Sequence, residues 1–119
     1  MEPTRKSALA PDETRKFDRG HVELLTIGDV VLGRATFEPG WIWSECVKPL
    51  AGTDSCEVHH NGYILSGRMH ILMDDGTEME VGEGDFFVCP PGHDAWTIGD
   101  RPCIALDFST GIAAYAKET

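Results

Sequence analysis

The sequence has little positive charge. Only 10 of its 119 residues are Lys or Arg, against 20 Asp or Glu, and the formal net charge is −10. A nucleic-acid-binding protein needs a basic surface that neutralises phosphates, and anionic lipid headgroups would be repelled by the same acidity. We therefore expect neither nucleic acid nor a membrane as a partner.

Long apolar runs are also missing. No stretch approaches the roughly 20 apolar residues that a membrane-spanning helix needs. The basic segment 1–6 is not followed by an apolar stretch with a small-residue cleavage site, so we do not expect a signal peptide. The predicted location is the cytoplasm.

The four cysteines include no Cys-x-x-Cys pair, and without a secretory signal they do not predict a disulfide framework. Most of them are expected to be buried as small apolar side chains. The hydrophobic fraction of 41% and the charged fraction of 25% are those of a folded globular protein, and the length suits a single core. The cysteines are Cys46, Cys56, Cys89 and Cys103.

Short β-prone runs separated by Gly, Pro and Asp fill the chain from Val22 onward. Asp75-Gly76 is a hairpin dipeptide, and Pro90-Pro91-Gly92 ends the run before it. Many short strands at this spacing predict an all-β sandwich or barrel. The expected strands are 22–27, 30–38, 41–47, 58–66, 68–73, 78–81, 85–89, 95–98 and 103–108.

The two ends of the chain differ from this pattern. Residues 1–17 are charged and contain Pro3 and Pro11, which predicts an N-terminal arm, with a turn of helix at Asp12-Glu13 as one option. Residues 111–119 predict a short helix or an added edge strand. Because there is no repeat or linker, we expect one domain over residues 18–119.

A first spaced motif lies in the middle of the chain. Gly40 is followed by five residues and then by Cys46-Val47-Lys48. After an interval, His60 is followed by six residues and then by Gly67.

A second motif follows it. Gly84, Pro90 and Gly92 have the spacing Gly-x5-Pro-x-Gly, and Ala95-Trp96 lies just downstream. Taken in this order, the two motifs resemble those of the cupin superfamily, in its small single-domain form. The resemblance implies a single-domain cupin β-barrel, that is, a double-stranded β-helix or jelly roll, around one pocket.

The resemblance also implies a metal site, but the usual ligands are replaced. Cys46 and Lys48 occupy the positions of the family's His-x-His, and His60 occupies the position of its glutamate. Eleven residues separate Lys48 from His60, where the family has three or four. The position of the last histidine falls on Asp94 or Ala95, directly after His93.

We predict that Cys46, His60 and His93 are the metal ligands. A thiolate with two imidazoles suits a borderline-soft divalent ion, so the candidates are Zn, Fe, Mn and Ni. With Asp94 as a ligand, the set would approach the two-histidine, one-carboxylate arrangement that suits iron. The alternatives are that Cys46 only fills the pocket and that His60 is hydrogen-bonded within the core.

The predicted substrate contacts are Lys48, Cys56, Trp43, Asp94 and Trp96. Lys48 would bind a carboxylate, or else be a solvated charge. Cys56 lies in the long insertion and could serve as a further metal ligand. The tryptophans would form an aromatic wall, or else pack in the core or at a dimer contact.

The remaining histidines are expected outside the site. His59 neighbours His60 and faces the opposite side of a strand, and His21 and His70 are predicted on the surface.

Three functions fit these observations: a metal-dependent enzyme acting on a small molecule, a non-catalytic ligand-binding or sensing module without metal, and a structural domain with an inert pocket. We favour a cupin that binds a small molecule and has an atypical divalent-metal site; whether it is an enzyme is left open. A homodimer is also expected, formed through edge strands and exposed apolar faces with the arm across the partner.

Overall fold

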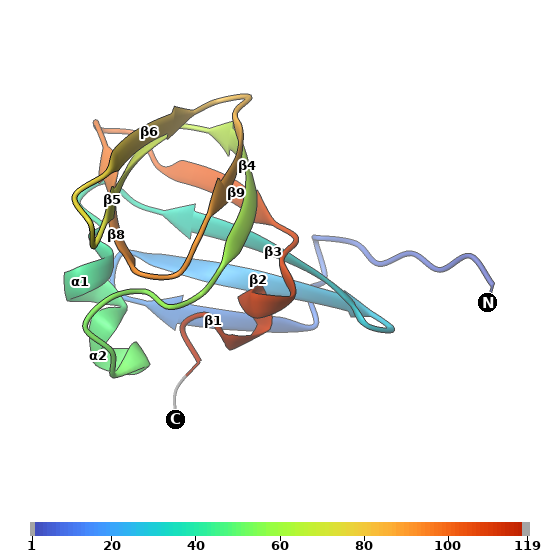
Figure 1. The fold of residues 1–119 in the computed structure, drawn as a ribbon. Helices are drawn as coiled ribbons and strands as arrows, with labels where there is room; N and C mark the ends of the chain where they lie inside the picture. The colour runs from blue at the N-terminus through green and yellow to red at the C-terminus, as the bar shows by residue number, and fades with distance from the viewer. Residues whose placement is uncertain (1, 118–119) are drawn as a thin grey trace.

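The computed structural model describes residues 2–117, which fold into two antiparallel sheets (Figure 1). A six-stranded sheet has the order β1-β2-β3-β9-β4-β7, and a three-stranded sheet has the order β6-β5-β8. The strands are β1 Glu13–Phe17, β2 Gly20–Ile27, β3 Val30–Phe37, β4 His60–Ser66, β5 Arg68–Met73, β6 Glu78–Gly82, β7 Phe86–Cys89, β8 His93–Ile98 and β9 Cys103–Asp107.

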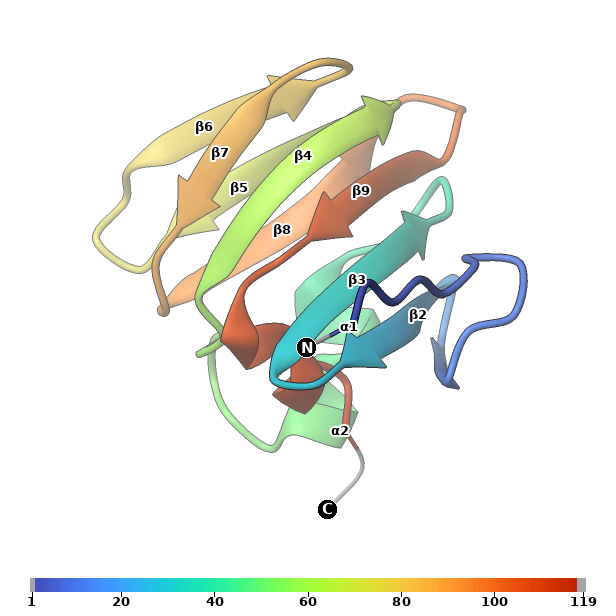
Figure 2. The ribbon, with the colours of Figure 1, turned by 90° about the vertical axis from the view of Figure 1, so that its right-hand side faces the viewer.

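The strands curl around a common interior, and Figure 2 shows β4, β5, β8 and β9 on its sides. The prediction of an all-β cupin barrel of the double-stranded β-helix type is confirmed. None of the helices in residues 2–117 is long and apolar enough to cross a bilayer.

Alternation along the strands decides which side chains reach the interior. In β8, His93, Ala95 and Thr97 are buried, whereas Asp94 and Trp96 face the other way. Successive residues of a strand point to opposite faces, so a shift of one residue exchanges the inner and outer sets.

The strand registers arrange the inner side chains in layers. His60 lies opposite Cys89, and Met73 opposite His93, near one end of the barrel. The next positions inward pair Gly62 with Phe87, Ile71 with Ala95, and Ala35 with Ala105. We call the end group of Cys56, His60, Cys89, His93 and Asp107 the polar layer. The apolar layers behind it contain Ala35, Phe37, Ile64, Met69, Ile71, Phe87, Ala95 and Ala105.

The predicted strand 41–47 is wrong, because this segment is mostly helical. α1 spans Trp43–Cys46, and α2 spans Lys48–Ala51 and ends at Gly52 in a left-handed conformation (φ 72°). A short apolar run can match the period of a strand and that of a helix. Here the buried residues Trp43, Cys46 and Val47 have the spacing of one helix face.

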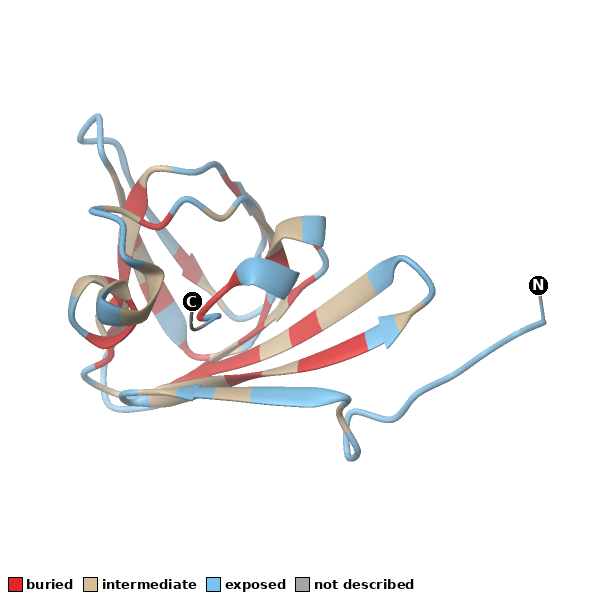
Figure 3. Cartoon of the chain, turned by 90° about the horizontal axis from the view of Figure 1, so that it is seen from below, coloured by how far each residue is buried: buried red, intermediate tan, exposed pale blue. Residues whose placement is uncertain are grey.

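The expected turn of helix at Asp12-Glu13 is also wrong. Residues 13–17 form β1, which pairs with β2 from Glu13 opposite Leu24 to Phe17 opposite Gly20. The Phe17 ring packs against Phe37, with centroids 6.1 Å apart, so burial of this ring favours the strand. The exposed extended segment is therefore shorter than the predicted arm (Figure 3).

At the other end, a 3-10 helix, η1, spans Thr110–Ala114. The predicted short helix is thus found, and residues 118–119 of the predicted tail lie outside the described residues. η1 packs against β3 at Gly33, where a Cβ atom would lie 2.6 Å from Ile112 Cγ1. Only glycine at this position lets η1 approach the end of the barrel so closely.

Candidate metal centre

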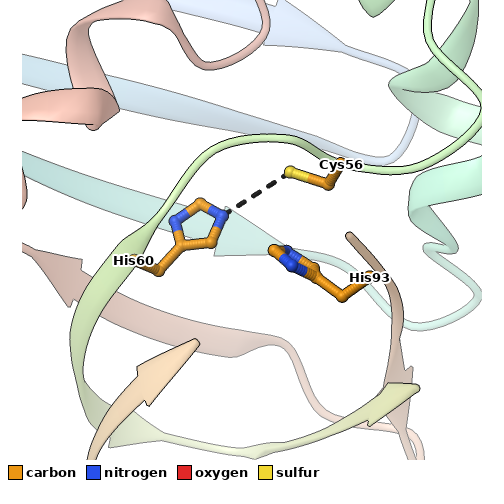
Figure 4. A group of neighbouring side chains, drawn as sticks. All are labelled: Cys56, His60 and His93. Atoms are coloured by element: carbon orange, nitrogen blue, oxygen red, sulfur yellow. Dashed lines mark hydrogen bonds between the residues drawn. The ribbon is translucent and has the colours of Figure 1, made fainter. Parts of the chain in front are cut away.

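Three side chains of the polar layer converge at one end of the barrel. Cys56, His60 and His93 each offer one ligand atom, and these atoms all lie within 4.8 Å of one another (Figure 4). His60 is the first residue of β4, and His93 is the first residue of β8. Cys56 comes from the segment between α2 and β4 and is held against β8, where its backbone N–H donates to the His93 carbonyl at 2.8 Å.

The His60 ring is oriented by Asp107, the last residue of β9. His60 Nδ1 lies 2.5 Å from Asp107 Oδ2, and Asp107 Oδ1 accepts hydrogen bonds from the Ser109 N–H and hydroxyl at 2.9 and 2.7 Å. Burial alone would raise the pKa of Asp107, but the hydrogen bonds from His60 and Ser109 and the charge of His60 lower it overall. An ionised carboxylate only accepts, so Nδ1 of His60 carries the proton.

That assignment leaves His60 Nε2 for another partner. It lies 3.7 Å from Cys56 Sγ. A histidine that donates its other ring N–H to a carboxylate is the usual arrangement behind a metal-bound imidazole.

The His93 ring is fixed in the same sense. Its Nδ1 lies 2.8 Å from the Pro90 carbonyl oxygen, which can only accept, so Nε2 again has the free lone pair. Burial, together with the nearby charge of His60, lowers the pKa of His93 to about 4. His93 is therefore neutral at neutral pH, as a metal ligand must be.

The cysteines of this layer are neutral thiols in the metal-free protein. Burial raises the pKa of Cys56 to about 12, with a further contribution from the charge of Glu57. Burial likewise raises the pKa of Cys89 to about 12, with a contribution from Cys56. A metal that binds Cys56 must displace its proton, so affinity must rise with pH.

The predicted ligand Cys46 is not part of this group. It lies on α1, and its Sγ is 3.8 Å from Asp18 Oδ2. Because Cys46 lies on a helix and not on the expected strand, its side chain points in a different direction. The structure brings together His60 and His93 as predicted, but with Cys56 from the insertion as the thiol.

Three of the predicted substrate contacts are not among the residues that line the cavity. Lys48 begins α2, and its Nζ is 3.9 Å from Asp54 Oδ1. Asp94 faces outward from β8 and accepts a hydrogen bond from the Ser44 N–H at 3.0 Å. Trp96, also on the outer side, stacks on His70 with ring centroids 4.6 Å apart.

The other predicted contacts do lie in the cavity wall. Trp43 and Cys56 are both buried and line it. His59 faces away from His60, as expected, and is 2.9 Å from Asn61 Oδ1 through its Nε2.

Two residues of the site were missed in the sequence. Asp107 follows Cys103 and Ala105 at alternate positions of β9, so a charged residue on an otherwise buried face was a usable signal. Tyr115 packs edge-on against His60, with centroids 5.6 Å apart, and burial raises its pKa well above the ordinary value. Tyr115 follows η1, and nothing in the local sequence pattern indicated that it belongs to the site.

The cavity next to this centre has a volume of about 50 Å³. Its walls are largely apolar, and its polar side-chain groups are those of the polar layer, the Tyr115 hydroxyl and the indole N–H groups of Trp41 and Trp43. The lining residues are Ala35, Phe37, Trp41, Trp43, Cys56, His60, Gly62, Met69, Ile71, Phe87, Cys89, His93, Ala95, Ala105, Leu106, Asp107, Ile112 and Tyr115.

Comparison with known proteins supports the assignment of the fold. A sequence model of the EutQ-like cupin domain matches residues 49–101, which is less than half of the chain. An RmlC-like cupin from Shewanella frigidimarina superposes with a TM-score of 0.60 over 89% of this chain and 88% of its own, at 16% identity. The chain therefore has the cupin fold.

Two further structural neighbours are enzymes of stated activity. The polyketide cyclase RemF from Streptomyces resistomycificus has a TM-score of 0.63 and 20% identity, over 89% of this chain and 78% of its own. Oxalate decarboxylase from Bacillus subtilis has a TM-score of 0.55 and 23% identity, over 81% of this chain but only 26% of its own. No curated protein matches this cupin in sequence. At these identities the likeness shows the fold alone.

Proposed function

We propose that this cupin binds a divalent metal ion through Cys56, His60 and His93 and holds a small molecule beside it. One observation carries the proposal. Both imidazoles have Nδ1 engaged, by Asp107 and by the Pro90 carbonyl, so that Nε2 is the unprotonated nitrogen of each ring, in a group that also contains a thiol. Core packing alone does not require two histidines beside the same thiol both to keep Nε2 unprotonated.

Zinc is the ion that this donor set favours. One thiolate and two imidazoles form a borderline-soft set, which suits zinc first and then iron or nickel, whereas manganese prefers oxygen ligands. Three protein ligands are also the number found in catalytic zinc sites. When bound, such an ion supplies Lewis-acid polarisation of a donor atom in the small molecule.

The chain's own residues have distinct roles in this proposal. Asp107 and Ser109 hold the His60 ring in one tautomer, and the Pro90 carbonyl does the same for His93. Tyr115, which is buried, packs edge-on against the His60 ring and shields it from water. Loss of such supporting contacts typically lowers metal affinity about 10- to 100-fold.

A non-catalytic ligand-binding function without metal is the second candidate. It is favoured by the largely apolar cavity and by the high pKa of the Cys56 thiol, which stays protonated until a metal displaces the proton.

The direct test is elemental analysis of protein purified without a histidine tag. We expect close to one equivalent of zinc, lost in His60→Ala and in Cys56→Ala and retained in His59→Ala, which changes the neighbouring exposed histidine. Circular dichroism would verify that each variant is folded. Folded wild-type protein that contains no metal and takes up none from zinc, iron, nickel or manganese salts would refute the centre and leave the metal-free alternative.

We also propose that this cupin is a homodimer. β7 is an edge strand of the six-stranded sheet, and apolar side chains on the outer face of β4 and β7 are exposed, including Tyr63 opposite Phe86. The Phe86 ring stacks on Phe108 beside this face, with centroids 6.0 Å apart. An exposed apolar face at a sheet edge favours self-association.

Light scattering tests this assembly. We expect a dimeric mass that becomes monomeric in Phe86→Glu, while Val30→Glu, at an exposed apolar residue on β3, leaves it unchanged. A monomeric wild-type protein would contradict the proposal. For location we propose the cytoplasm, because all four cysteines are free thiols and a reducing compartment keeps them so; fractionation of cells would test it.

A further inference from the structure

The cavity beside the metal centre has no Lys or Arg among its lining residues, all of which lie in the described part of the chain. From this and from the charge balance of the polar layer, we propose that the ligand is a small, uncharged and largely apolar molecule, not a carboxylate or phosphate anion. The inference rests on the proposed metal centre and concerns the class of molecule that the centre receives.

The charges of the polar layer cancel when a divalent ion is bound. One positive charge is balanced by the Cys56 thiolate and the other by the Asp107 carboxylate, while His60 and His93 are neutral ligands. A centre built from histidines alone would keep a net charge of about +2 for an anion to approach. The centre of this cupin offers an anion no net attraction.

The basic side chains Arg15 and Lys48 do not supply positive charge to the cavity. Arg15 donates hydrogen bonds to the carbonyl oxygens of Ala113 and Tyr115, at 2.6 and 2.9 Å, and is not part of the lining. Lys48, once expected to be a pocket cation, pairs with Asp54. A buried anion without a cationic partner has a large desolvation cost.

A cationic ligand is not favoured either. Both carboxylate oxygens of Asp107 already accept hydrogen bonds, one from His60 and two from Ser109. Asp107 is the one carboxylate among the lining residues. The layers behind the centre are formed by apolar residues such as Ile71 and Phe87, so the buried part of a ligand must be apolar.

The volume limits the ligand further. At about 50 Å³, the cavity is much smaller than an engineered cavity of about 150 Å³ that takes up benzene. It therefore suits a molecule with only a few non-hydrogen atoms, or one end of a longer molecule.

Acetone and acetate provide a matched pair for the test, because they have nearly the same shape and differ in charge. The cupin has three tryptophans, of which Trp41 and Trp43 line the cavity and Trp96 lies outside it. Their indole N–H signals in nitrogen-15 NMR give two reporters and an internal control. Titrations would be run on zinc-loaded and on metal-free protein.

We expect acetone to shift the Trp41 and Trp43 signals and not the Trp96 signal, and acetate to bind at least about tenfold more weakly. In zinc-saturated Asp107→Asn, which removes one negative charge without changing the shape, acetate should bind several-fold more tightly than in the wild type. Acetate binding as tight as acetone, or no acetone shift at all, would overturn the inference.

The two proposals can fail separately. If zinc loads and acetate is preferred, the centre stands and the ligand class is wrong. If zinc does not load, the centre is wrong, but the metal-free protein still decides the ligand class, since Asp107 remains the charged group of the lining.

Discussion

The two ends of the barrel interior are built differently. In the apolar layers, every member comes from a strand and is placed by the register of the sheets. In the polar layer, His60 and His93 begin strands and Asp107 ends one, while Cys56 belongs to a loop and the supporting Ser109 lies beyond β9. The strands therefore supply the scaffold, and the site is formed where they meet the connecting segments.

Removing a side chain from the apolar layers should have the largest effect on stability and none on metal binding. Ile64 is fully buried, so Ile64→Ala should lower the free energy of unfolding by about 2–5 kcal/mol through lost burial and the cavity left behind. Urea denaturation measures the change. Zinc content should stay near one equivalent in the folded variant; a parallel loss of zinc would show that the two regions are not separable.

Acidification should destabilise the metal-free protein through the polar layer. The pKa of His93 is lowered from 6.5 to about 4, so between these values the unfolded chain takes up a proton that the folded chain does not. Stability is therefore complete above pH 6.5 and falls by about 3 kcal/mol as the pH drops to 4. Urea denaturation at a series of pH values measures this loss.

His93→Gln should remove most of that pH dependence, whereas His59→Gln, at the exposed neighbour of His60, should retain it. A wild-type protein equally stable at pH 7 and pH 4.5 would contradict the burial of a neutral His93.

Changing Asp107, whose carboxylate orients the His60 ring, should affect metal binding more than folding. Asp107→Asn loses the charge that stabilises the His60 tautomer, so zinc affinity should fall about 10- to 100-fold. Competition with a chromogenic chelator measures the affinity. Asp94→Asn is the matched control on the outer side of β8, and its affinity should equal that of the wild type; an equal loss in both variants would refute the role of Asp107.

The smallest effect is expected on the outer side of the barrel. Asp94 accepts a hydrogen bond from Ser44 at the start of α1, so Asp94→Ala should cost about 1 kcal/mol of stability, as for a lost helix cap. Thermal unfolding would show this as a modest shift with unchanged zinc content. A large loss of zinc would mean that Asp94 serves the centre after all.

The sequence predicted the cupin barrel because the turns and the spacing of glycine and proline carry local information. It also predicted that His60 and His93 belong to one site. Glycine and proline act through backbone geometry, which survives the replacement of the usual ligands.

The other site residues depend on information that is not local. Cys46 was expected on a strand, but its short apolar run forms α1, which directs the thiol toward Asp18. Asp94 and Trp96 differ from His93 and Ala95 by one position each, and a one-residue shift exchanges the faces of a strand. Cys56 reaches the centre by way of a loop, and Asp107 reaches it from 47 positions along the chain from His60.

Anomalous diffraction at the zinc edge, from crystals of the zinc-loaded protein, tests the proposed metal centre most directly. We expect one strong peak at the polar layer, about 2.3 Å from Cys56 Sγ and about 2.0–2.1 Å from Nε2 of His60 and of His93. A crystal grown with zinc in excess that shows no peak there, or a peak bonded to Nδ1 or to other residues, would contradict it.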